Sequence, residues 1–482
     1  MAEDNRDQDH RKVSLPVMTG YGAGQIGAQI FRDTPAVLLP IFMTTMLGIP
    51  AWLSGFVILV PKLWVIVCDP LVGVWSDRLK GSKGRTPFLW AGSLLTSIGF
   101  LALFTILDYG DPLTAAICVC LIFFVSSTGF SLYSVPYLAM ASELSSDRHE
   151  RTRIMAYRMI ATMGGVVLGV GVAQPLVFQL GGGAKGWHTM AIAFSILCLA
   201  TMVIPAIVLR RTKLLSSGEP PARILDQLGA VFANRPFSIL LATTFVQGIG
   251  QASGYTVLGF YYLYALGQVS IIPQMIMCLA AGSFLSQPLF FWLSRVFGKE
   301  RCYVAASLGW VAITCTWFYV YPGSPVLFQL PLLGEVTEQG ALVLLRAFVL
   351  GIVNSGFLLL SYSMLTDTVD LQRRTKGAAN EGVFSGLFTA AEKLAFALGP
   401  VIAGLVMSAY GFQSSTGGAM EQSEEAVTGI KLLYSFIPVG TQILSLVIFA
   451  FYRLDPAILD DDHKALKPSD VPGAVNLATA HD

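Results

Sequence analysis

The sequence predicts an all-α membrane protein with twelve transmembrane helices, arranged as two six-helix bundles around a central cavity. Composition is the first observation behind this prediction, because 54% of the 482 residues are hydrophobic and only 13% are charged. Soluble proteins carry about 25% charged residues. The second observation is a series of long apolar runs, and the third is where lysine and arginine lie between them. The net charge of +1 also lacks the basic excess that draws a protein to nucleic acid.

Twelve apolar runs are long enough to cross a bilayer. A transmembrane helix needs about 20 mostly apolar residues, because backbone polar groups find no water in the hydrocarbon core. The predicted spans are 17–47, 52–76, 87–107, 113–143, 155–180, 188–209, 236–266, 270–296, 302–321, 340–366, 382–408 and 428–452. They predict an N-terminal tail (1–16), a first six-helix bundle (17–209), a central loop (210–235), a second six-helix bundle (236–452) and a C-terminal tail (453–482).

Basic residues predict the orientation of these spans. Outside the spans, every lysine and arginine except Lys185 lies in one of the two tails or in an even-numbered loop. Lysine and arginine are retained on the cytoplasmic side of a membrane. We therefore expect a multi-pass protein of the cell inner membrane, with both termini and the central loop in the cytoplasm.

A few charged residues lie deep within the spans. Each costs on the order of 3 kcal/mol near the bilayer centre, so such side chains are expected to face a partner or a water-filled space. The acids are chiefly Asp33, Asp69 and Glu392, and two of the bases are Arg32 and Lys393. With a rise of about 1.5 Å per residue, Asp69 and Lys393 lie at comparable depths and could meet across the central cavity.

Histidine and cysteine do not form the clusters that bind metals or cofactors. The seven cysteines lie in or beside apolar runs, where they are typical of small buried residues, and none of the five histidines lies deep within a span. A glycine loop for ATP phosphates is also missing from the sequence. We therefore expect no cofactor and no metal site. The expected partners are a small-molecule substrate and the lipid bilayer.

A motif follows the second span directly. Gly73 allows close helix packing, while Asp77 and Arg78, with a basic cluster that ends at Arg85, can form an acid–base latch at the cytoplasmic face. This pattern resembles the loop 2–3 signature of the major facilitator superfamily and implies its fold. The predicted cytoplasmic gate consists of Gly73, Asp77, Arg78, Arg85 and Arg151 in the first bundle and of Asp367, Asp370 and Glu381 in the second.

Three further motifs, in order and at the expected helix ends, resemble those of the glycoside-pentoside-hexuronide:cation symporters, the melibiose permease group. They consist of Pro61, Trp64, Asp69 and Pro70 on the second span; Glu150, Arg151, Tyr157 and Arg158 entering the fifth; and Asp367, Asp370, Gly377, Glu381 and Lys393 at the eleventh. The resemblance extends over nearly the whole chain. It implies a monomeric secondary active transporter that moves a sugar, glycoside or hexuronide by cation symport through alternating access.

The resemblance also implies roles for individual residues. It points to Asp69 and Lys393 for cation coupling, and to Arg158 and Lys393 for the sugar pocket. The chain departs from the family pattern where Val65 and Ser134 replace expected acids, and where Gln29 replaces a sugar-binding aspartate. The predicted substrate-binding set is Arg158, Gln29, Arg32, Asp33, Tyr133, Ser134, Tyr137 and Lys393.

The departures bear on the coupling ion. A sodium ion needs several oxygen ligands, whereas a proton needs one ionisable group whose proton affinity responds to its surroundings. With Val65 and Ser134 in place, a proton is favoured and sodium stays possible. Excess positive charge in the spans indicates an anionic substrate such as a hexuronide.

Other functions stay open at this point. Asp69 and Lys393 could form a permanent structural pair in a uniporter. The substrate could be an amphipathic or anionic non-sugar solute, such as a lysophospholipid, which a vertebrate branch resembling this family carries. A membrane-embedded enzyme or lipid-handling protein is the alternative of another class. The spans, however, show none of the paired acids, histidines or serine–base arrangements that an enzyme would need.

Overall fold

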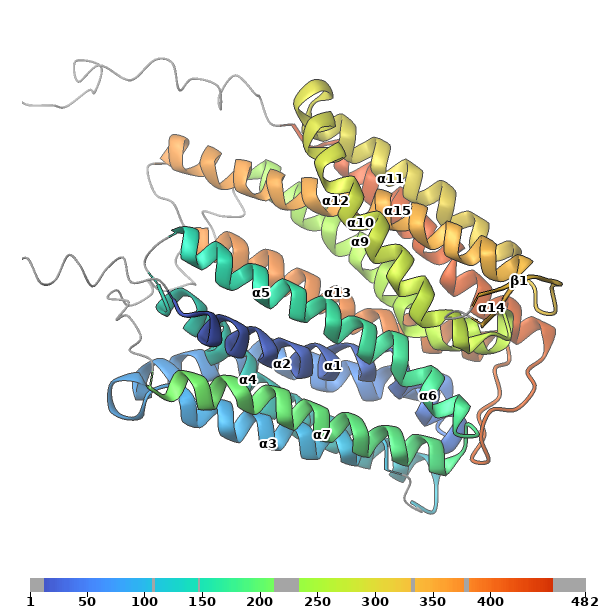
Figure 1. Ribbon diagram of the computed structural model, residues 1–482. Coiled ribbons are helices and arrows are strands. Elements are labelled where there is room, and N and C mark those ends of the chain that lie inside the picture. Colours follow the sequence, from blue (N-terminus) through green and yellow to red (C-terminus); the bar gives the residue numbers. More distant parts are fainter. Residues whose placement is uncertain are drawn as a thin grey trace, which may run out of the picture.

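The computed structural model describes residues 13–105, 109–145, 148–211, 234–330, 334–376 and 381–453. Nearly all of them are helical, and Figure 1 shows the long helices side by side, with the first half of the chain below the second. Most of the predicted tails and central loop lies outside the described residues, so these boundaries stay predictions.

Two groups of helices follow one another along the chain. The first group consists of α1 (Leu15–Met46), α2 (Ala51–Lys83), α3 (Thr86–Leu103), α4 (Pro112–Glu143), α5 (Arg148–Val166), the π-helical turn η2 (Val167–Val172), α6 (Ala173–Gln179), α7 (Ala184–Val208) and η3 (Leu209–Arg211). The second consists of α9 (Arg235–Phe260), η4 (Tyr261–Ala265), η5 (Val269–Ile271), α10 (Ile272–Phe297), α11 (Lys299–Cys315), η6 (Thr316–Tyr319), α12 (Glu338–Lys376), α13 (Glu381–Ala409), α14 (Glu424–Tyr434) and α15 (Phe436–Phe449).

Each group packs as a bundle. In the first, α1 packs against α5 and α7, α3 against α4 and α7, and α2 against α4. In the second, α12 packs against α10 and α11, and α9 against α13 and α15. The bundles contact each other chiefly through α2 with α13, α1 with α9, and η2 with α10. The predicted all-α fold of two bundles is therefore confirmed.

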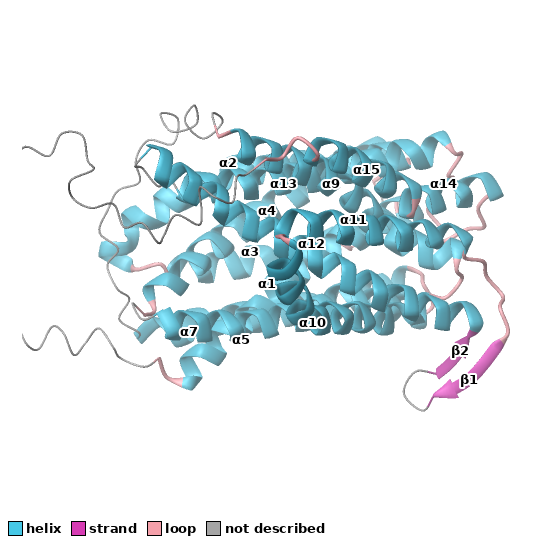
Figure 2. Cartoon of the chain, turned by 90° about the horizontal axis from the view of Figure 1, so that it is seen from above, coloured by secondary structure: helices cyan, strands magenta, loops and turns pink. Residues whose placement is uncertain are grey.

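The two ends of the bundles differ. The start of α1 and the end of α15 lie on the same side of the bundles, which we call the terminus side (Figure 1). The opposite side carries a two-stranded antiparallel hairpin, β1 (Val326–Leu330) and β2 (Gly334–Thr337), and we call it the hairpin side. Figure 2 shows the hairpin at one edge of the molecule, beyond the helix ends.

Ten spans among the described residues are long and apolar enough to cross a membrane on their own. The two other predicted spans are α1 and α9, which carry several glutamines and lie against each other between the bundles. In α1, every residue from Asp33 to Met46 is buried. Because neighbouring helices rather than lipid surround such a helix, it can be more polar than the rest. The chain is thus a multi-pass membrane protein.

Candidate functional site

An ion pair between α2 and α13 joins the two halves. Lys393 Nζ donates a hydrogen bond to Asp69 Oδ2. Both residues lie about 20 Å from the terminus-side ends of their helices, at about 1.5 Å per residue. Asp69 Oδ1 is buried and receives no hydrogen bond from the described residues. The structure therefore brings together the two residues expected to meet, and their role in cation coupling stays a prediction.

A ladder of hydrogen bonds runs along one face of α1 and ends on α5. Arg158 Nε donates to Gln25 Oε1 at 3.0 Å, and Gln25 Nε2 donates to Gln29 Oε1 at 3.3 Å. Gln29 Nε2 then donates to Asp33 Oδ2 at 2.6 Å. Arg32 Nε donates to the other carboxylate oxygen of Asp33 at 3.3 Å. The four-residue spacing places the three α1 acceptors on one helix face, so two amides connect a guanidinium to a carboxylate.

Arg32 is the exposed end of this ladder. Its side chain is 67% exposed, whereas that of Asp33 is 8% exposed. Arg32 lies near the middle of α1, and it is near enough to Tyr255 on α9 and Glu392 on α13 to interact with them electrostatically. Its guanidinium therefore faces the space between the two halves.

Groups from both halves surround this space. Tyr362 OH on α12 donates to Glu392 Oε1 at 3.1 Å, and Lys62 Nζ on α2 donates to Phe396 O of α13 at 3.2 Å. Lys62 also interacts electrostatically with Arg32 and Asp33. We call the set the central polar site; its members are Arg32, Asp33, Lys62, Tyr255, Tyr362 and Glu392. The predicted substrate-binding set did not include Tyr362 or Glu392, although a carboxylate at membrane depth was the available signal for Glu392.

Two tyrosines predicted to bind substrate are packed inside the first bundle. Tyr133 is 0% and Tyr137 2% exposed, and their rings stack at 5.2 Å. Tyr137 also stacks on Tyr21 at 4.4 Å and donates to Tyr21 O at 2.7 Å. Arg158 lies over the Tyr137 ring, 5.9 Å from its centroid. Tyr137 thus supports Arg158 from behind, while Ser134 is half-buried beside it on α4.

Three of the predicted gate residues make ion pairs within their own half of the chain. Arg85 is buried and donates to Asp77 Oδ1 at 2.5 Å, within the first half. Lys299 on α11 donates to Asp367 Oδ2 at 2.6 Å, within the second. The side chains of Arg78 and Asp370 are exposed, and those of Arg151 and Glu381 lie outside the described part. A latch between the two halves stays a prediction.

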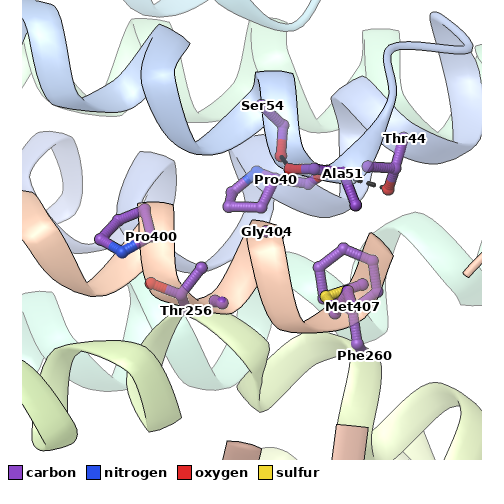
Figure 3. Close-up of a pocket in the computed structure, with 10 residues that line it drawn as sticks. Pro40, Thr44, Ala51, Ser54, Thr256, Phe260, Pro400, Gly404 and Met407 are labelled. Atoms are coloured by element: carbon purple, nitrogen blue, oxygen red, sulfur yellow. Dashed lines mark hydrogen bonds between the residues drawn. The ribbon is translucent and has the colours of Figure 1, made fainter. Parts of the chain in front are cut away.

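On the hairpin side, α2 and α13 pack backbone to backbone. A Cβ added at Gly404 would lie 2.2 Å from Ala51 O, and one added at Gly55 would lie 2.6 Å from Pro400 O. Figure 3 shows this contact, with Pro400 and Gly404 of α13 beside Ala51 and Ser54 of α2. We call it the hairpin-side seam. Sequence reasoning missed it, since glycine and proline patterns do not show which helix lies opposite.

Hydrogen bonds to backbone carbonyl groups extend the seam. Gly48 N donates to Ser415 O at 3.0 Å, and Ser415 N donates to Thr44 O at 2.8 Å. Gln174 Nε2 of α6 donates to Gly259 O of α9 at 2.9 Å. The loop after α1 and α6 are therefore both fastened to the second half.

On the terminus side, the same two helices are apart. Gly73 follows Asp69 by four residues and Gly386 precedes Lys393 by seven, so these glycines lie on the faces that carry the ion pair. A Cβ added at Gly386 would meet no atom within 4 Å, and one at Gly73 would meet only Val135, at 3.7 Å. The close packing predicted for Gly73 is therefore not present in this conformation, which is closed on the hairpin side and open on the terminus side.

Known proteins resemble the chain over nearly its full length. The isoprimeverose transporter of Lactiplantibacillus pentosus is 24% identical, covering 92% of this chain and 90% of its own. A protein of Escherichia coli (strain K12), whose name marks it as a proposed glycoside/cation symporter, is 23% identical, covering 97% and 99%.

Two solved structures share the fold. A point mutant of the nucleoside transporter NupG has a TM-score of 0.63 at 13% identity and covers 91% of this chain and 100% of its own. A bacterial homologue of the iron transporter ferroportin has a TM-score of 0.62 at 15% identity and covers 92% and 99%.

The family described as MFS/sugar transport protein matches residues 20–456. This range includes nearly all of both bundles, the ion pair between α2 and α13, and the central polar site. The match agrees with the resemblance to the melibiose permease group that the motifs carry. The chain therefore belongs to the MFS/sugar transport protein family, in the major facilitator superfamily.

Proposed function

We propose that the protein is a secondary active transporter that moves a sugar, glycoside or hexuronide across the inner membrane by symport with a proton. The single observation that carries the proposal is the ion pair between Asp69 and Lys393. It connects the two halves at a position between the hairpin-side seam, where α2 and α13 are in contact, and the terminus side, where they are apart. Family membership and the names of the two relatives support a sugar-type solute.

The chemistry around Asp69 favours a proton as the coupling ion. One carboxylate oxygen is already bonded to an ammonium group, and the residue one turn away on α2 is Val65. A sodium ion would have few oxygen ligands there and would be repelled by Lys393. A proton on Asp69 instead removes the charge that holds Lys393, so the link between α2 and α13 weakens. Proton binding is thereby coupled to relative motion of the halves.

Orientation follows from the basic residues. If the terminus side is cytoplasmic, as the positive-inside rule predicts, this conformation is open to the cytoplasm. Alternating access in such folds is rocking of one bundle against the other around a central site. Here it requires the hairpin-side seam to separate while the terminus-side ends of α2 and α13 approach each other.

The central polar site supports a solute with an anionic group. Arg32 is largely exposed, and Lys62 donates only to a neutral carbonyl among the described residues. A guanidinium binds a carboxylate through two parallel hydrogen bonds. A hexuronide would place its carboxylate against Arg32.

The test is the external pH of a lightly buffered suspension of energy-depleted cells that produce the protein. Pulses of hexoses, glycosides and hexuronides are added with and without sodium. The wild-type protein and Asp111→Asn, a control far from the ion pair, should alkalinise the medium with the transported solute. Asp69→Asn should lose alkalinisation and uphill accumulation while retaining exchange of labelled solute. Full accumulation by Asp69→Asn would refute proton coupling at this residue.

A further inference from the structure

Three carboxylates lie deep within the described helices, and two of them are already engaged. Asp33 is 8% exposed and accepts hydrogen bonds from Gln29 and Arg32. Asp69 is 17% exposed and is held by Lys393. Glu392 is half-buried, and the hydrogen bond described for it comes from a neutral hydroxyl, that of Tyr362. The second oxygen of Asp69 also receives no hydrogen bond from the described residues, but it is buried. Glu392 is therefore the half-buried deep carboxylate that can offer an acceptor to a ligand.

The surroundings of Glu392 suit a polyhydroxy ligand. Tyr362 is 49% exposed, and its ring leans on Phe388, with 5.5 Å between the centroids. Its hydroxyl holds Glu392 in place while its ring presents an apolar face beside the carboxylate. A sugar combines hydroxyl donors with apolar C–H faces, and binding pockets combine a few placed polar groups with aromatic walls.

The opposite wall has the opposite charge. Arg32 and Lys62 come from the first half, and Glu392 comes from the second. Arg32 and Glu392 interact electrostatically across the intervening space. A ligand that contacts both walls is consequently polarised: its acceptor or anionic end faces Arg32, and its hydroxyl donors face Glu392.

We propose that Glu392 is a substrate-binding residue that accepts hydrogen bonds from sugar hydroxyls on the second half, while Arg32 binds the opposite end of the same molecule. This inference rests on the proposed function, because it assumes a sugar-type solute. It adds a contact on α13 beside Lys393, and it orients the solute between the bundles. Lys393 faces Asp69 on α2, whereas its neighbour Glu392 faces Tyr362 on α12, so one turn of α13 serves both coupling and binding.

The test is calorimetric binding of matched hexose and hexuronate pairs, such as glucose with glucuronate and galactose with galacturonate, to the purified full-length protein. Hydrogen bonds to a charged group are about twice as strong as neutral ones, and losing them weakens binding by about 10- to 100-fold. Glu392→Gln should raise the Kd of every bound sugar by this factor. Tyr362→Phe should raise it by only about 2- to 5-fold, because a neutral bond is lost. Arg32→Gln should weaken the hexuronate more than the hexose.

Glu392→Asp is the control for misfolding: it retains the charge, so it should recover part of the affinity that Glu392→Gln loses. Unchanged Kd values in Glu392→Gln would overturn the proposal. If no sugar pair binds to the wild-type protein, the ligand class is wrong and the proposal falls with it. Asp69→Asn separates the two ideas, because it should keep sugar binding while losing coupling to protons. Sugar binding that is lost in Glu392→Gln, together with unimpaired coupling in Asp69→Asn, would support this inference and refute the coupling model.

Discussion

The two ends of the α2–α13 contact are built differently. On the hairpin side, Gly55 and Gly404 bring backbones together so closely that an added Cβ would overlap the facing carbonyl group. On the terminus side, Gly386 has open space before it, and an added Cβ at Gly73 would meet only Val135 of α4, so neither glycine contacts the facing helix. One pair of helices therefore carries small residues at both ends, and only one end is in contact.

The difference teaches how the halves can separate. Among the described residues, the hairpin-side seam is held by close packing and by hydrogen bonds that involve backbone groups, without an ion pair. Contacts of this kind are individually weak and can be exchanged for equivalent contacts elsewhere. The ion pair of Asp69 with Lys393 lies between the two ends, where a change of charge can shift the balance between them.

The largest expected effect comes from adding a side chain at each end. Gly404→Val forces atoms against Ala51 O, and overpacking costs about 1–3 kcal/mol or more, so the seam-closed population should fall by about 10- to 100-fold. Gly386→Val has room in this conformation and should instead oppose closure of the terminus side. Both changes should slow uptake in proteoliposomes, but they should trap opposite states.

Labelling separates the two traps. A cysteine introduced at Thr389, an exposed residue between Gly386 and Lys393 on α13, should react less with a membrane-impermeant thiol reagent in the Gly404→Val protein and more in the Gly386→Val protein. Uptake at the wild-type rate by Gly404→Val would show that the seam does not need to close in the cycle.

The next expected effect is a change of coupling ion. Val65 lies one turn from Asp69 on α2 and is half-buried. Val65→Asp would add a second carboxylate one helical turn from Asp69, of which one oxygen receives no hydrogen bond from the described residues. Hard cations bind through several such oxygens, so sodium or lithium should stimulate uptake several-fold. Val65→Asn is the neutral control. An unchanged ion preference in Val65→Asp would contradict the account of proton selection.

Sequence reasoning predicted the bundle architecture well, and it named the two charged residues, Asp69 and Lys393, that the structure pairs. The bilayer requires each spanning helix to be apolar and favours lysine and arginine on its cytoplasmic side, so these patterns can be read from each helix separately. For this reason, the meeting of Asp69 with Lys393 could be expected from depth and helix rise alone.

Sequence reasoning performed less well where the outcome depends on which helices pack together. Tyr133 and Tyr137 are of a residue type that commonly lines sugar pockets, yet their rings stack inside the first bundle. The partnership of Glu392 with Tyr362 depends on the rotation of α13 against α12, which no local pattern specifies.

A smaller effect is expected from the ladder on α1, which lies within one half and does not cross the seam. Gln29→Leu would leave an oxygen of buried Asp33 without its donor, at a cost of about 1–3 kcal/mol. The thermal unfolding temperature should fall. Sugar affinity should also fall, because Asp33 is no longer held in place by Gln29 and so no longer fixes the position of Arg32. Thr45→Val removes one local hydrogen bond to Ile41 O on the same helix and should leave affinity unchanged. Equal effects of the two substitutions would assign the ladder a purely structural role.

The smallest effect is expected at Asp111, on the hairpin side but outside the seam. Its carboxylate accepts hydrogen bonds from the Thr114 hydroxyl and from the backbone N–H groups of Thr114 and Leu113, which cap α4. These bonds, the Thr114 hydroxyl foremost, hold the pKa of Asp111 below its ordinary value. A carboxyl group with a lowered pKa in the folded state stabilises the fold above its unfolded pKa, and this contribution is lost as the pH falls through the folded pKa.

Substitutions at Asp111 test whether the seam alone controls access on the hairpin side. Asp111→Ala should lower the unfolding temperature slightly at neutral pH, whereas Asp111→Asn should keep the cap and lose its share of the pH dependence. Unfolding temperatures recorded from neutral pH down through the acid range would show both effects. Neither variant should alter uptake or cysteine labelling, because α4 contacts no helix of the second half extensively. A change in labelling would mean that the hairpin side opens as a whole, rather than along the contact between α2 and α13.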